Sequence, residues 1–168
     1  MAGGLALLAL QQRVAVVECV TDSSAGTCTC DGVDLSELNH NGQQRFSASD
    51  GNYTVWFSIG IPLSAAVVGD ASATALVEQC AGASNDPAVI RFLTANSTSD
   101  CQSFGDQDSM TGEVIEELGS GKKLNVAWTH RQGTEPVRQF TAVLTNGTDQ
   151  SPGHLIRSPN ADVNGYVF

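Results

Sequence analysis

The clearest pattern in the sequence is a strict alternation of side chains over residues 53–59. Tyr, Val, Phe and Ile take every second position, with Thr, Trp and Ser between them. Successive side chains of a strand point to opposite faces, so this segment predicts a strand with one buried face. Asp-Gly-Asn at 50–52 favours a tight turn before it. We therefore predict a β-hairpin over residues 45–61, ended by Pro62, which has no amide hydrogen for a ladder.

Further short apolar segments extend this pattern. Residues 124–128 and 140–144 alternate in the same way, and a loop of hairpin size over 132–136 joins them. Residues 88–93 form an apolar run of strand length. Residues 71–80 fit a helix or a strand, and their alanines favour the helix. Together these segments predict an all-β fold, either a flattened β-barrel or a sandwich of short antiparallel strands.

The remaining segments are expected to be connections. Residues 23–32 are rich in Gly, Ser, Thr and Cys and predict a loop, followed by a short turn at 34–38. Residues 94–112 are polar and rich in turn-forming side chains, and 113–118 form a short amphipathic piece. We see no internal repeat and no long segment of low complexity.

Length and charge limit the classes of function. The 168 residues suit one domain, which we assign to residues 18–168. Acidic residues are scattered along the chain and give a net charge of -10, with no basic stripe to neutralise phosphates. Nucleic acid binding is therefore not expected.

The first 17 residues leave two interpretations open. Two apolar runs at 3–10 and 14–17 are interrupted by Gln-Gln-Arg, and no basic residues precede them. The segment is either a degenerate signal peptide or the first strand or short helix of the domain. No other segment approaches the roughly 20 apolar residues of a membrane span, so we expect any membrane anchor to lie beyond Phe168.

Sequons and cysteines point to a lumenal or extracellular domain. Asn52, Asn96 and Asn146 each begin an N-glycosylation triplet. The five cysteines are an odd number, so at least one is unpaired or bonds outside the chain. The single residue between the second and third does not match metal or redox spacing, and disulfides are the expected fate. The disulfide candidates are Cys19, Cys28, Cys30, Cys80 and Cys101.

No set of residues forms a catalytic pattern. A nucleophile elbow and a glycine-rich phosphate loop are both absent, and the three histidines stand isolated in polar segments. Asp106 and Asp108, followed by two glutamates at 116–117, resemble a calcium loop at its first, third and last positions. Thr111 occupies the position that requires Gly, so we expect a solvated acidic loop. The sequence thus predicts no metal, no cofactor and no enzyme.

Several motifs follow one another in the order of a known family. Cys30, Asp-Leu-Ser-Glu-Leu at 34–38, Gly-Asn-Tyr at 51–53 and Pro-Leu at 62–63 resemble the opening of the mannose 6-phosphate receptor homology family. Gly60 stands where that family has a cysteine. Cys-Gln at 101–102, Thr-Asn-Gly-Thr at 145–148 and Arg-Ser at 157–158 look like its later elements. The resemblance spans most of residues 28–168.

The resemblance implies a lectin-like domain of the secretory pathway. In the family a Gln, an Arg, a Glu and a Tyr hydrogen-bond the hydroxyls of mannose, which suits their fixed donors and acceptors. It implies Arg157 and Gln102 as sugar ligands, with Gln79 as a substitute for Gln102. The implied partner is a mannose-type glycan or glycoprotein cargo, bound by a sorting receptor in the Golgi, endosome or lysosome, or outside the cell. The alternative for Arg157 is a surface side chain beside Asp162.

Two other functions stay open. One is a degenerate family member that no longer binds sugar and acts as a structural or protein-binding module. The other is a secreted β-sandwich hydrolase in which Asp106 and Asp108 do the chemistry.

Overall fold

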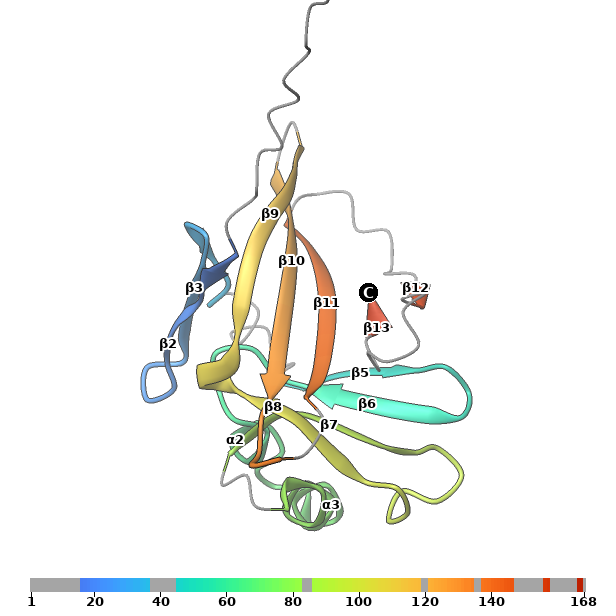
Figure 1. The fold of residues 1–168 in the computed structure, drawn as a ribbon. Helices are drawn as coiled ribbons and strands as arrows, with labels where there is room; N and C mark the ends of the chain where they lie inside the picture. The colour runs from blue at the N-terminus through green and yellow to red at the C-terminus, as the bar shows by residue number, and fades with distance from the viewer. Residues whose placement is uncertain are drawn as a thin grey trace, which may run out of the picture.

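The structure is a computed structural model that describes residues 16–36, 45–82, 86–118, 121–134, 137–146, 156–157 and 166–167. Most of these residues lie in antiparallel strands, and helices are few (Figure 1). Two four-stranded sheets pack face to face without closing into a barrel. The predicted all-β class is confirmed, in its sandwich form.

The first large sheet has the strand order β5-β6-β7-β8. Its strands are β5 (Phe46–Ser49), β6 (Tyr53–Phe57), β7 (Pro87–Leu93) and β8 (Gln102–Asp106). The turn between β5 and β6 is held by the carboxylate of Asp50, which accepts the N–H groups of Asn52 and Tyr53 at 2.9 and 2.8 Å. The predicted hairpin is therefore confirmed, but its second strand ends at Phe57 and does not continue to Pro62.

The second large sheet has the order β1-β9-β10-β11. It consists of β1 (Val17–Glu18), β9 (Thr111–Leu118), β10 (Gly121–His130) and β11 (Arg138–Asn146). Both segments are strands, as their alternating patterns predicted, and the β10–β11 pairing places Trp128 opposite Phe140. The segment expected as a short amphipathic piece at 113–118 is most of strand β9.

Aromatic side chains fill the space between the two sheets. Phe57 lies 5.7 Å from Trp128 and 5.3 Å from Phe140, measured between ring centroids. Trp128 is fully buried. Val55 and Phe57 belong to this inner core, whereas Trp56 packs in a second cluster on the other face of the sheet. The two faces of β6 thus follow the period-two pattern of its sequence.

The second cluster is covered by helices. Helix α2 (Leu63–Ala66) begins directly after Pro62, and α3 (Ala71–Ala81) is capped by Asp70, whose carboxylate accepts the Ala73 N–H at 2.9 Å. The buried face of α3 packs against β7 beside Trp56. Of the two interpretations for residues 71–80, the helix is confirmed.

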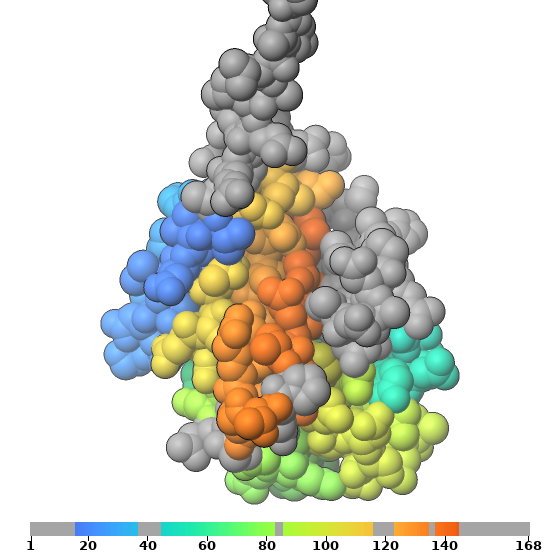
Figure 2. Space-filling view, in the orientation of Figure 1, coloured from blue at the N-terminus to red at the C-terminus, as the bar shows by residue number. Residues whose placement is uncertain are grey.

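A small third sheet corrects one prediction. Residues 23–32, expected to be a loop, contain β3 (Thr27–Cys30), which pairs with β2 (Val20–Asp22) and β4 (Val33–Asp34). Its Thr-Cys-Thr-Cys sequence buries both cysteines and exposes both threonines. The alternation of exposed threonines and buried cysteines was not recognised in the sequence, because these side chains are small and differ little in hydrophobicity. The sheet lies beside β9 (Figures 1 and 2), and its buried residues Cys28, Cys30 and Val33 belong to the core between the two large sheets.

The connection expected over residues 94–112 also contains a strand. It holds β8 and the 3-10 helix η1 (Gln107–Ser109) before β9 begins. The buried side chain of Gln107 explains why a polar segment becomes ordered. Its amide donates to the backbone oxygens of Ser58 and Ile61 at 3.1 and 2.6 Å, and accepts from the Gly60 N–H at 3.1 Å.

Disulfides join the small sheet and helix α3 to their neighbours. Cys19 is bonded to Cys30, and Cys80 is bonded to Cys101. Cys28 is unpaired and buried, as the odd number of cysteines required. Burial, together with the charge of Asp34, raises the pKa of the Cys28 thiol to about 12. The two disulfides indicate an oxidising compartment.

No helix among the described residues is long and apolar enough to cross a membrane. Residues 1–15, on which the signal-peptide interpretation depends, lie outside the described ranges.

Candidate functional site

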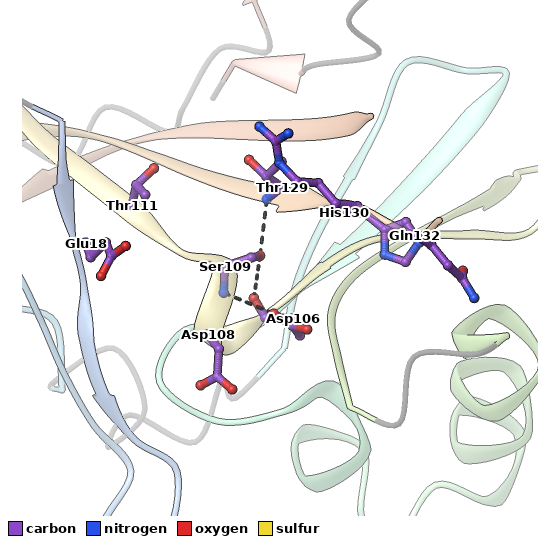
Figure 3. Close-up of a pocket in the computed structure, with 9 residues that line it drawn as sticks. Glu18, Asp106, Asp108, Ser109, Thr111, Thr129, His130 and Gln132 are labelled. Carbon is purple, nitrogen blue, oxygen red and sulfur yellow. Dashed lines mark hydrogen bonds between the residues drawn. The ribbon is translucent and has the colours of Figure 1, made fainter. Parts of the chain in front are cut away.

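A pocket of about 660 Å³ opens at one end of the sandwich (Figure 3). Its walls come from β1, the end of β8, η1, the start of β9 and the end of β10. Three hydroxyl side chains contribute to it, from Ser109, Thr111 and Thr129. Its charged and amide-bearing lining is Glu18, Asp106, Asp108, His130, Arg131 and Gln132.

Hydrogen bonds around η1 shape the floor of this pocket. The Asp106 carboxylate accepts the Ser109 N–H at 3.0 Å, while the Ser109 hydroxyl donates to the Asp106 carbonyl at 2.8 Å. That hydroxyl also accepts the Thr129 N–H at 3.2 Å. Gly105 permits this close approach, because a Cβ there would lie 2.7 Å from the Ser109 oxygen and 3.0 Å from Trp128.

The pocket offers little of what hydrolysis needs. The Ser109 hydroxyl already donates its proton to a backbone carbonyl, so no base takes that proton. The Asp106 carboxylate is held as the cap of η1. Among the described residues, no group of three or more His, Cys, Asp or Glu side chains is arranged to hold a metal ion. The hydroxyl, carboxylate and amide groups of the lining can hydrogen-bond a polar ligand.

The residues predicted to bind sugar lie in separate places. Gln102 begins β8 in the first large sheet. Gln79 lies on the exposed face of α3 and donates to the Thr98 carbonyl at 3.0 Å. Arg157 belongs to β12 (Ile156–Arg157), a short strand that pairs with β13 (Tyr166–Val167). The Arg157 side chain, like Asp162, lies outside the described part of the chain.

Gln102 stands beside a polar cluster that the sequence analysis missed. Its partner across the β7–β8 ladder is Arg91, and directly opposed side chains share one face of a sheet. The Arg91 guanidinium lies 4.3 Å from the centroid of the Tyr53 ring. Tyr53 donates its hydroxyl to the Asp100 carboxylate at 2.7 Å, and that carboxylate lies 3.9 Å from the guanidinium. We call these four residues the Tyr53 cluster.

The members of the Tyr53 cluster differ in accessibility. Arg91 is 6% exposed, whereas the Asp100 side chain is 40% exposed. Gln102 and Tyr53 are partly buried. The hydrogen bond to Asp100, and the negative charge of that carboxylate, raise the pKa of Tyr53. Asp100, Tyr53 and Gln102 are thus accessible to solvent, and the buried Arg91 side chain lies beneath them.

One signal for this cluster was present in the sequence. Arg91 interrupts the apolar run of β7, Pro-Ala-Val-Ile-Arg-Phe-Leu, and a charge within a buried strand requires a partner. The partner itself was not predictable, because Asp100 lies in a loop and meets Tyr53 only through the antiparallel pairing of β6 and β7.

Two of the three sequons lie together, at the end of the first sheet away from the pocket. Asn52 and Asn96 are exposed in the β5–β6 turn and the β7–β8 loop. The Thr94 N–H donates to the Asn52 carbonyl at 2.9 Å and joins the two turns. Asn146 ends β11, and its side chain is outside the described part.

Comparison of the chain with protein-family models, curated proteins and solved structures gave no match.

Proposed function

We propose that the chain is a lectin-like domain that binds mannose-type glycans on glycoproteins, without catalysis, in the lumen of the secretory pathway or outside the cell. The observation that carries this proposal is the Tyr53 cluster. It combines an amide, a phenol and a guanidinium on neighbouring strands with a carboxylate from the β7–β8 loop. These are the chemical groups that the family resemblance implies for a mannose site.

The geometry of the cluster is compatible with sugar recognition. The carboxylate of Asp100 has acceptor capacity beyond the Tyr53 bond, and the Gln102 amide supplies both donors and an acceptor. Vicinal hydroxyls of a hexose donate and accept at once, so one ring can bond to both side chains. The Arg91 guanidinium holds the Tyr53 ring in place by stacking on it, and it also lies 5.2 Å from the centroid of the Phe104 ring.

The two disulfides support the proposed location, because such bonds persist in oxidising compartments. The exposed sequons at Asn52 and Asn96 fit the same environment. The finer assignment to Golgi, endosome, lysosome or cell exterior, with a role in cargo transport, rests on the family resemblance.

A glycan array tests this proposal. The protein, made in a secretory host, is applied beside Gln102→Ala, Arg157→Ala and the matched control Glu78→Ala, which changes an exposed side chain of α3. We expect binding to mannose-type glycans that falls about tenfold in Gln102→Ala, since one hydrogen-bonding side chain is lost. Arg157→Ala tests the ligand role that the resemblance gives to that residue. Absence of glycan binding by the unmodified protein would leave the degenerate protein-binding module as the better proposal.

The hydrolase is the second candidate, because Asp106 and Asp108 do line the pocket. A panel of glycosides and esters tests it with Asp108→Asn as the inactive variant. A uniformly inactive panel would remove this candidate.

A further inference from the structure

The pocket in Figure 3 has two walls of opposite hydrogen-bonding character. Glu18, Asp106 at the end of β8 and Asp108 of η1 supply acceptors from one side, and His130 and Gln132 lie on the other. Among the described residues, no hydrogen bond or ion pair engages the side chains of Glu18, Asp108 or Gln132. The buried Nε2 atom of His130 also has no hydrogen-bond partner within the described ranges. The carboxylates of Glu18 and Asp108 and the amide of Gln132 are thus uncommitted hydrogen-bonding groups around the pocket.

This lining selects against most ligand classes. Three carboxylates repel phosphates and carboxylates, and only Arg131 opposes them. Metal ions find no group of three ligands among the described residues. Flat aromatic ligands meet no aromatic ring other than His130 in the lining. A neutral polyhydroxylated ring is the ligand class that fits this lining, because each of its hydroxyls can donate to a carboxylate and accept from a donor on the other side of the pocket.

We propose that this pocket is a second saccharide site, separate from the Tyr53 cluster, so that the domain binds one branched glycan at two points. This inference rests on the proposed lectin function. The volume of about 660 Å³ lies in the range of small-molecule sites, and it accommodates a hexose unit.

The spacing of the two sites supports bivalent binding. Gln102 begins β8 and Asp106 ends it. Four residue steps along a strand span about 13 Å. That distance is comparable to the separation of sugar units on neighbouring branches of one oligosaccharide. Engagement of both sites would raise the affinity for branched glycans over that for a single sugar, by about 100-fold or more when the linkage fits.

The sequons at Asn52 and Asn96 lie away from this pocket. Asn52 and Asn96 lie near the turn that carries Tyr53 and the loop that carries Asp100. The pocket is at the opposite end, where Asp106 pairs with Pro87. Glycans carried by these two sequons would therefore stand away from the second site.

The test uses the full chain and two probes, methyl α-mannoside and a branched mannopentaose. Backbone amide NMR follows residues 131–132 and Gln102 separately during each titration. The variants are Asp108→Asn and Gln132→Ala, with Glu78→Gln on the exposed face of α3 as the matched control. Each change is on an exposed side chain, so folding is expected to be retained and is checked by the same spectra.

We expect the monosaccharide to shift both sets of resonances with two separate affinities. Asp108→Asn should abolish the shifts at residues 131–132, preserve those at Gln102, and lower pentaose affinity at least tenfold. Shifts confined to Gln102, unaffected by Asp108→Asn, would overturn the second site while leaving the proposed function intact. Shifts at neither site would overturn both proposals.

Discussion

The disulfide between Cys80 and Cys101 should contribute strongly to stability, because it closes a loop with a sequence separation of 21. It joins the end of α3 to the residue before Gln102, and thereby attaches the helix to the start of β8. Changing both cysteines to alanine removes the bond and keeps the buried Cys80 position apolar. A serine there would add a polar group to the core.

The expected loss follows from the size of the loop. Loop-closure entropy for this separation gives about 3 kcal/mol. For the Cys19–Cys30 bond, with a separation of 11, the same reasoning gives about 0.6 kcal/mol less, since this loop is about half as long. Either loss is a large part of the roughly 5–15 kcal/mol that stabilises a typical domain.

Urea denaturation followed by tryptophan fluorescence measures this loss. Trp56 packs in the same cluster as Cys80 and reports on the helix-covered face. The free energy of unfolding of the double variant should fall by about 3 kcal/mol, and the slope against urea should rise, because the denatured chain becomes less compact. A loss below about 1 kcal/mol would refute the loop-closure reasoning. The unmodified protein in reductant provides a second comparison.

Three further predictions test other parts of the structure. Gly112→Ala should lower unfolding free energy by about 1–3 kcal/mol in urea, because its Cβ would lie 2.9 Å from the Cys30 Cβ; an unchanged midpoint contradicts that packing. The raised pKa of Tyr53 predicts that its tyrosinate absorbance appears above pH 10. The hydrogen bond to Asp100 should stabilise the fold below pH 10 and be lost as the phenol ionises at higher pH. An unfolding free energy with the same dependence on pH in Tyr53→Phe contradicts this. At pH 8, Cys28 of the native protein should react with iodoacetamide more than 1000-fold more slowly than Cys28 of the urea-unfolded protein, because its pKa is about 12. The stability contributed by its neutral thiol is lost as pH rises from 9 towards 12. Equal reaction rates in the native and unfolded protein contradict its burial.

Period-two alternation explains which parts of the fold were predictable. In β6, β10 and β11 large apolar side chains alternate with polar ones, and these strands were located correctly. Strand β3 has the same period but builds it from threonines and cysteines, whose contrast in hydrophobicity is small. Strand β8 contains a Gly and a Ser that become buried only because β7 pairs with them, so its burial depends on tertiary structure.

The candidate sites were less predictable than the strands, because they depend on the register between strands. Gln102 was predicted as a sugar ligand from its motif, whereas its neighbour Arg91 follows only from the β7–β8 pairing. Likewise, Asp106 and Asp108 were seen as an acidic loop, whereas the structure makes them the cap and surface of η1 at a pocket wall. No local pattern in the sequence shows that Glu18, some 90 residues before Asp106, lines the same pocket.

Isothermal titration of a mannose-type oligosaccharide into the disulfide-intact protein tests the central claim most directly. The account predicts saturable heat from the unmodified protein and an affinity about tenfold weaker in Gln102→Ala, with Glu78→Ala unchanged. Equal affinities in all three proteins, or no binding by a folded and oxidised sample, would contradict it.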